Sequence, residues 1–334
     1  MTKLAYDPQL ARYEELTTNA LYGRRSNELL AVAKLCPDIL IEIFMTVQAS
    51  FLERYEEALI SYNHDHRAIA RFGWLTVTHV CHYWRTIALE TPKLWATLYP
   101  VPAAWIQEFL QRSRGAPLTL RFVTPDSFHE VARLEHETSL DLALQALPRA
   151  EQLVLRIPEA SLDRVHRFAT GQDLGNLRRI VLQNLTQCYD SEREEHSHQL
   201  LKFDCHPPSL THLAIANFPI RWNERFFVPT LTHLTLQTHD TASSRPSFLV
   251  EPLLKMLSTL PRLTNITLGH MFKHSSDAWA AASGASVIQL PELREIDIWD
   301  LCGPMTYLIS HLQVPSSCRI ALHQAPNQPA LRLA

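Results

Sequence analysis

Glycine is scarce in this sequence, with 8 residues in a chain of 334, although it averages about 7% of residues in proteins. Loops that bind phosphate through backbone N–H groups need several glycines within a few positions. The closest pair here is Gly171 and Gly175, and the motifs GxGxxG, GxxxxGK[ST], GxSxG and HExxH are all missing. The common nucleotide-binding, hydrolase and metalloprotease classes that carry these motifs are therefore excluded.

The sequence also lacks a secretion signal, paired cysteines and long apolar runs. Its six cysteines show no CxxC spacing, and its apolar stretches are interrupted by charge well before the ~18 residues that a membrane span needs. A net charge of -3 provides no general field that would hold a polyanion or an anionic membrane. We expect a reduced intracellular protein, cytoplasmic and/or nuclear, with neither nucleic acid nor a membrane among its partners.

What is present is a composition typical of globular proteins, with 46% hydrophobic and 19% charged residues. At about 150 residues per domain, the length favours two domains. Residues 1–34 show only a loose helical periodicity, interrupted by Gly23, and we interpret them as a helical lead-in.

A sharper helix pattern begins near residue 35. Pro37 and Asp38 suit the first turn of a helix, because proline lacks an N–H that would be unpaired there and a negative charge interacts favourably with the helix dipole. Ile39, Ile43 and Val47 follow at spacings of four residues. The pattern predicts a short helix with a broad apolar face.

Residues 48–72 are rich in charged and polar side chains, and we interpret them as a polar insertion lying over the surface. Beyond them, apolar residues recur at helical spacing from Leu75 to Ala88. The segment stops at Thr91 and Pro92, where proline cannot continue a helix.

After residue 100 the pattern changes to short alternating stretches of the form LxxLxL, often preceded by Pro-x-Leu. Their middle apolar residues, which lie 21 to 33 positions apart, are Leu153, Ile180, Leu213, Leu234, Ile266 and Ile296. Weaker units lie at Leu118–Leu120 and Arg319–Leu322, and residues 162–168 and 253–257 have helical patterns.

This pattern resembles the leucine-rich repeat, in which each unit contributes one strand and one return segment to a stacked parallel sheet. The resemblance implies an α+β protein, with a helical module followed by an irregular α/β solenoid over 101–323 and a tail over 324–334. Strands of an ordinary α/β sheet are the alternative, because strand spacing alone does not fix the curvature.

In a solenoid, the residues flanking the buried positions emerge together on the concave face, since side chains alternate across a strand. This predicted face changes from basic to acidic plus aromatic along the chain, which favours a protein ligand. Its candidate substrate-binding residues are Arg156, Arg179, His212, His233, Gln237, Glu295, Asp297 and Trp299. A solvated face without function is the alternative.

Two segments resemble the two halves of an F-box domain of the type found in large fungal families. The first is Leu35-Cys36-Pro37-Asp38-Ile39-Leu40-Ile41-Glu42-Ile43-Phe44. The second joins Val80-Cys81-His82-Tyr83-Trp84-Arg85-Thr86-Ile87-Ala88 to Thr91-Pro92-Lys93-Leu94-Trp95. The resemblance covers about a fifth of the chain, and departs from the family at Cys36 and at His82-Tyr83. We assign the domain to residues 35–100.

The resemblance implies a function in ubiquitin conjugation. F-box proteins bind an SKP-type adaptor, and through it a cullin, in SCF ubiquitin ligases, while a second region holds the substrate. So small a domain has apolar residues in excess of its own core, which need a partner or the neighbouring repeats. The candidate adaptor-binding residues are Leu35, Pro37, Ile39, Leu40, Ile43, Phe44, Trp84, Leu94 and Trp95. Of these, Leu35, Pro37, Leu40 and Leu94 match the family positions most often found at the adaptor.

No catalytic residue, metal site or cofactor is predicted. His64 with His66, His79 with His82, and His212 with His233 are possible ligand pairs, but each offers two ligands where a structural zinc site needs four. His196 and His198 lie in a charged run typical of a loop. Besides the receptor hypothesis, two alternatives stay open: a repeat scaffold that binds proteins without a ligase, and an enzyme without a recognisable motif.

Overall fold

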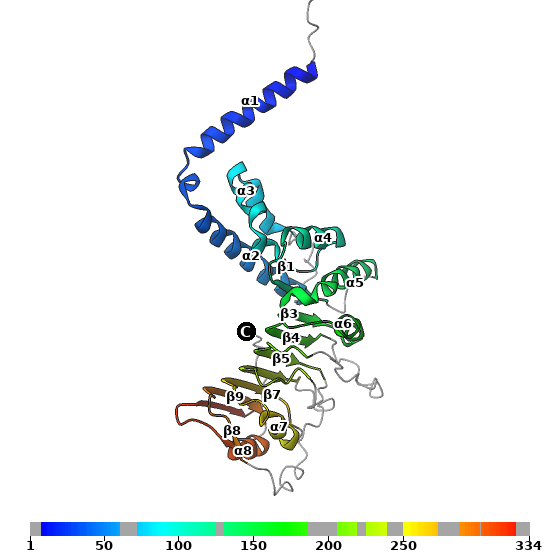
Figure 1. Cartoon of the computed structure of the whole chain (residues 1–334), viewed down its shortest axis with the longest axis vertical. Coiled ribbons are helices and arrows are strands. Elements are labelled where there is room, and N and C mark those ends of the chain that lie inside the picture. Colours follow the sequence, from blue (N-terminus) through cyan, green and yellow to red (C-terminus); the bar gives the residue numbers. More distant parts are fainter. Residues whose placement is uncertain are drawn as a thin grey trace, which may run out of the picture. The chain divides into compact units, whose positions relative to one another are not determined.

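The computed structural model describes residues 8–60, 72–124, 130–185, 206–218, 225–238, 250–272, 287–300 and 302–324. The chain divides into two compact units: Met1–Ala96 with Leu110–Arg114, and Thr97–Phe109 with Gly115–Ala334. The division lies before the short strand β1 (Thr97–Leu98), a few residues ahead of the predicted boundary at 100. Figure 1 shows helices in the first unit and a stack of strands with helices in the second.

The first unit is helical. Its α-helices are α1 (Pro8–Glu28), α2 (Pro37–Ile60) and α3 (His82–Glu90), and its 3₁₀ helices are η1 (Ala31–Lys34), η3 (Gly73–His79) and η4 (Pro92–Trp95). Helix α2 begins at Pro37 with Asp38 in its first turn, as predicted. Helix α3 ends before Thr91, whose hydroxyl donates to the carbonyl of Ile87 (2.7 Å).

The interpretation of residues 48–72 as a surface insertion is wrong for 48–60, which continue helix α2. Phe51, Leu52, Tyr55 and Leu59 from this stretch are buried. Leu52, Tyr55 and Leu59 recur every three to four residues and so share one face of the helix, whereas Glu53, Arg54 and Glu57 are exposed. The polar composition concealed this periodicity. Residues 61–71 lie outside the described part of the chain.

The core of the first unit is aromatic. The rings of Trp74 and Trp95 meet edge to face with their centroids 5.4 Å apart. The ring centroids of Phe44 and Trp84 are 5.1 Å apart. The indole N–H of Trp95 donates to the carbonyl of Ala88 (2.8 Å), as a buried indole requires. These contacts fix α3 and η4 against each other.

The second unit contains a nine-stranded sheet in which every paired strand is parallel and the strands lie in chain order. The strands after β1 are β2 (Leu118–Val123), β3 (Ala150–Ile157), β4 (Arg179–Asn184), β5 (His212–Ala216), β6 (His233–Gln237), β7 (Asn265–Gly269), β9 (Glu295–Asp300) and β11 (Arg319–Gln324). A separate two-stranded sheet pairs β8 (Ile288–Gln289) with β10 (Leu312–Gln313). The predicted parallel sheet in a mixed α/β protein is confirmed.

The register of the strands matches the alignment of the sequence units. The six middle residues, Leu153, Ile180, Leu213, Leu234, Ile266 and Ile296, are paired one to the next across β3 to β9. All six are at most 2% exposed. Ile320 of β11 continues the row but is 42% exposed, because β11 is the last strand of the sheet among the described residues.

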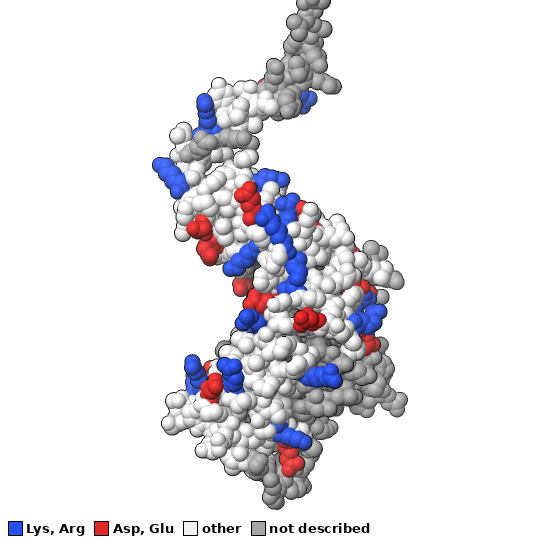
Figure 2. All heavy atoms as spheres, viewed as in Figure 1, with Lys and Arg blue, Asp and Glu red and all other residues white. Residues whose placement is uncertain are grey.

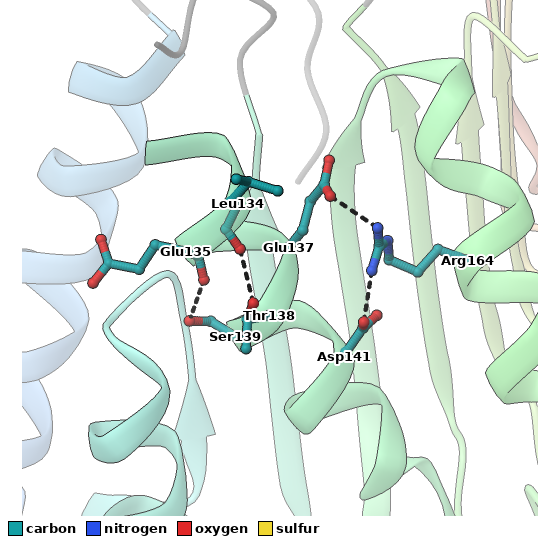
Figure 3. A network of polar contacts seen from close by, with 7 residues as sticks. All are labelled: Leu134, Glu135, Glu137, Thr138, Ser139, Asp141 and Arg164. Atoms are coloured by element: carbon teal, nitrogen blue, oxygen red, sulfur yellow. Dashed lines mark hydrogen bonds and ion pairs between the residues drawn. The ribbon is translucent and has the colours of Figure 1, made fainter. Parts of the chain in front are cut away.

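Helices accompany the strands: α4 (Ala103–Arg112), α5 (Glu130–Gln145), α6 (Leu162–Ala169), α7 (Val250–Leu257) and α8 (Cys302–Ser310). The predicted helices at 162–168 and 253–257 are confirmed. In Figure 3 the side chain of Arg164, from α6, reaches both Glu137 and Asp141 of α5 (2.9 and 2.6 Å). A charge-assisted contact to two carboxylates fixes the geometry of adjacent helices.

Candidate binding surfaces

Four of the residues predicted to bind an adaptor form the core of the first unit instead. Leu40 and Leu94 are 0% exposed, Phe44 1% and Trp95 2%, so none of them presents its side chain to a partner. The backbone carbonyl of Leu94 also accepts a hydrogen bond from the Gln48 side chain (2.8 Å). This part of the prediction is wrong, because an apolar stripe at helical spacing serves internal packing as well as an interface.

The remaining predicted residues are accessible, and three apolar side chains form a stripe along α2. Ile39 is 49% exposed, Ile43 is half-buried and Val47 is 38% exposed. Since they are four residues apart, they share one face of the helix, beside the buried face. Pro37 is exposed, and Leu35 and Trp84 are half-buried. We call Ile39, Ile43 and Val47 the α2 stripe.

A groove of 450 Å³ lies at the start of α3. Val80 and Tyr83 (54% and 37% exposed) line it on one side, and Leu30 and Val32 line it on another. The hydroxyl of Tyr83 donates to the carbonyl of Leu35 (3.2 Å), which holds η1 near α3. We call this the α3 groove.

The sequence pattern missed the role of Val80 and Tyr83. It predicted one helix from Leu75 to Ala88, whereas a 3₁₀ helix ends at His79 and α3 begins only at His82. Val80 therefore lies at a junction where helical periodicity does not predict burial. The indole N–H of Trp84, in the groove wall, is shielded from solvent and has no hydrogen-bond partner within the described ranges.

The predicted face of the large sheet exists: all eight candidate residues lie on strands and are half-buried. Arg179, His212, His233, Asn265 and Glu295 occupy laterally paired positions on β4 to β9. Asp297 lies two residues after Glu295 on β9. Arg156, Gln237 and Trp299 each lie four residues after the member of this row on their own strand. The register thus places all of them on one side of the sheet. We call this side the open face.

Two imidazole rings stack at the centre of the open face. The rings of His212 and His233 have centroids 4.1 Å apart and an interplanar angle of 12°. The hydroxyl of Thr211 is 2.8 Å from Nδ1 of His212 and donates to the carbonyl of Arg178 (3.0 Å). Thr232 repeats the arrangement with His233, and donates to the carbonyl of Thr211.

Each of these two carbonyls also accepts two backbone N–H groups, those of Thr211 and His212 at Arg178 and those of Thr232 and His233 at Thr211. The threonine hydroxyl and Nδ1 therefore form a hydrogen bond that either group can donate, and the geometry accommodates both tautomers of each histidine.

Burial and positive charge act together on this part of the open face. Burial lowers the pKa of Arg179, and the nearby charge of Arg121 lowers it further. The pKa of His212 is lowered by burial, then by His233 and Arg179, and the pKa of His233 by burial and Arg179. Figure 2 shows acidic and basic side chains interspersed on the face of the molecule that it draws.

A hollow of 350 Å³ lies over β4, β5 and β6, bounded by Arg179, His212 and His233. Val181, Ala214 and Thr235 also line it, and are small or apolar. Arg179 and the two imidazoles therefore border a space with a largely neutral floor.

The acidic residues of the open face already have partners on strand β11. Glu295 accepts a hydrogen bond from Asn265 (3.2 Å) and lies 3.7 Å from Arg319. Asp297 lies 3.2 Å from Nε2 of His323, whose ring stacks on Trp299 with centroids 3.7 Å apart. The change from basic to acidic along the face is as predicted, but its carboxylates have partners on the neighbouring strand.

Comparisons with known proteins found no matching family model, no similar curated protein and no similar solved structure. Within the described ranges, no helix has the length and apolar character needed to cross a membrane. The same residues contain no group of three or more histidine, cysteine or acidic side chains suited to a metal ion. His64, His66, His196 and His198 lie outside the described residues.

Proposed function

We propose that this chain is an F-box-type substrate-recognition subunit of an SCF (cullin-RING) ubiquitin ligase. In this proposal the first unit binds an SKP-type adaptor, which connects the chain to a cullin, and the leucine-rich-repeat-like second unit binds a target protein on the open face. The chain itself is non-catalytic, since ubiquitin transfer occurs on other subunits, and it works in the cytoplasm and/or the nucleus.

The observation that carries the proposal is exposed apolar surface in and directly beside the two F-box-like segments. The α2 stripe and the α3 groove leave aliphatic and aromatic side chains in water, and contiguous apolar surface of this kind marks interaction sites. The adaptor-binding set becomes Leu35, Pro37, Ile39, Ile43, Val47, Val80, Tyr83 and Trp84.

A second candidate function is a protein-binding scaffold that assembles no ligase. The burial of Leu40, Phe44 and Leu94 favours it, because the first unit closes its core without a partner. The two candidates share the open face and differ in whether the α2 stripe binds an adaptor.

Coexpression with an SKP-type adaptor separates them. We expect the full chain to copurify with the adaptor, and Ile39→Asp to weaken the complex at least about 30-fold, because interface anchors contribute about 2 kcal/mol or more. Val287→Asp is the matched control, since Val287 is similarly exposed (59%) but belongs to the second unit. Isothermal titration calorimetry measures the affinity of the adaptor for both variants and for the unmodified chain. No complex with the unmodified chain, or equal losses in the two variants, would refute the receptor function in favour of the scaffold.

A further inference from the structure

We propose that the outer edge of strand β11 binds an extended segment of the target protein as an additional strand of the sheet. The segment places an acidic residue beside Arg319 and an aromatic residue beside His323. Two aliphatic residues of the segment lie beside Ile320 and Leu322. This deepens the proposed function, on which it rests only for calling the bound protein a target.

The first argument is the backbone of β11, which pairs with β9 alone among the described strands. The N–H of Arg319 donates to the carbonyl of Arg294 (2.8 Å), on the side of β9. The bonding direction alternates from residue to residue along a strand, so Ile320 and Leu322 direct their N–H and C=O groups away from β9. A row of such groups is a template for a further strand.

The second argument is the apolar pair on the side of β11 opposite the open face. Ile320 is 42% exposed and Leu322 is 46% exposed. Their partners on β9, Ile296 and Ile298, are 1% and 0% exposed. The pair thus continues two buried rows of the sheet and leaves almost half of its own surface in water. An added strand with aliphatic residues at the same two positions would bury that surface.

The third argument comes from the side chains of β11 on the open face. The side chain of Arg319 is 79% exposed, although it lies 3.7 Å from Glu295 on β9. The imidazole of His323 stacks on Trp299 with one face, and its side chain is 40% exposed. The next strand position therefore borders the second flank of both groups. An acid there extends the alternation of charge, and an aromatic ring extends the stack.

Charge favours a foreign segment over a second copy of this chain. A two-fold axis perpendicular to the sheet would make two β11 strands antiparallel, with paired side chains on the same face. The pairing that brings Ile320 against Leu322 then places Arg319 opposite His323. Two basic side chains in that position repel each other when the imidazole is protonated, and neither supplies an acid. A segment that carries an acid is the better match.

The test uses the full chain without adaptor and fluorescein-labelled peptides of about twelve residues, measured by fluorescence anisotropy. One peptide contains the core Glu-Ile-Ala-Val-Tyr and another contains the reversed core, because a strand can add in either direction. We expect one of them to bind, and to bind at least about fivefold more weakly when its glutamate is replaced by lysine. No binding by either peptide at about 1 mM would overturn the site.

Backbone N-methylation of the bound peptide distinguishes strand addition from other binding modes. Only every second residue of an added strand directs its N–H towards β11. Methylating one alternate set, either the aliphatic residues or those between them, should weaken binding at least about tenfold. Methylating the other set should leave binding within about threefold. Equal effects of the two sets would overturn the proposal, and this readout does not depend on a variant folding.

Variants of the chain locate the site on β11. Ile320→Pro removes an outward N–H at an edge position that tolerates proline, and should weaken binding at least about tenfold. Ile320→Ala also shortens the side chain but keeps the N–H, so it should weaken binding less. Circular dichroism confirms that both variants are folded. Equal weakening by the two variants would indicate side-chain contact alone and reject the added strand.

Charge reversal tests the contact with Arg319. Arg319→Glu should make the lysine peptide bind more tightly than the glutamate peptide. Arg262→Glu is the control, because Arg262 is also exposed but precedes β7, away from the edge. An unchanged preference for glutamate in Arg319→Glu would reject the assigned contact.

Sedimentation of the full chain identifies other occupants of the edge. A dimer that Ile320→Pro dissociates would assign the edge to a second copy. Peptide binding that appears only in a chain ending at Gln324 would assign it to residues 325–334, and either result overturns the proposal. A negative outcome concerns β11 alone, because the adaptor complex is measured separately. Peptide binding without an adaptor complex would instead leave this site to the scaffold function.

Discussion

The stacked pair His212 and His233 gives the second unit a predictable response to pH. Burial lowers the pKa of both imidazoles in the folded chain, so the unfolded chain takes up protons first as the pH falls. Their contribution to stability is present above the unfolded pKa of about 6.5 and is lost as the pH falls through the lower folded pKa.

We therefore expect the unfolding temperature of the second unit to fall between about pH 7 and pH 5, and the double variant His212→Gln, His233→Gln to flatten that dependence. Thermal unfolding followed by circular dichroism at several pH values provides the measurement. His311→Gln serves as control. If the double variant and the unmodified chain lose stability in parallel, the histidines are not the responsible groups.

The strands of the sheet place equivalent residues in very different surroundings. Ile296 of β9 and Ile320 of β11 are paired in register, yet they are 1% and 42% exposed. Ile296→Ala should lower the free energy of unfolding by about 2–5 kcal/mol through the cavity that it leaves, and Ile320→Ala by less than about 1 kcal/mol. Denaturant unfolding compares them. Similar losses would mean that β11 is covered in solution.

The sheet was more predictable from sequence than the helical unit. Each strand carries its own alternation, so Leu213 and Leu234 could be aligned without knowing what covers them, and the register confirms that alignment. The α2 helix shows the opposite case. Ile39 and Leu40 are adjacent and both aliphatic, and only the packing of α3 and η4 decides that Leu40 is buried and Ile39 exposed. Which of two adjacent apolar residues is buried depends on tertiary contacts, and these cannot be inferred from helical periodicity alone.

The open face was predictable for the same reason as the strands, but its chemistry was not. The sequence placed His212 and His233 on neighbouring strands, yet it could not show that their rings stack or that the threonine before each is hydrogen-bonded to its Nδ1. It also missed that β11 would supply partners for Glu295 and Asp297, because Arg319 and His323 belong to the weakest of the sequence units.

The chain-order stacking of the strands makes stability a local property of the second unit. Each central strand pairs only with the strands before and after it in the order (Figure 1), so opening can spread from an end without breaking the middle. Amide hydrogen exchange measured by mass spectrometry should be fastest in β11 and slower in β9 and β7. Uniform protection from β4 to β11 would show that the sheet opens as one cooperative unit.

The unbroken ladder also constrains what the open face can recognise. In the central strands, the backbone N–H and C=O groups are already used by neighbouring strands, so a visiting polypeptide cannot join the sheet there and is read through side chains alone. Exchanging a few protruding residues, such as Arg179 for an acid, would then alter which sequence is preferred while the scaffold beneath stays the same. Such a surface can change its ligand without changing its architecture.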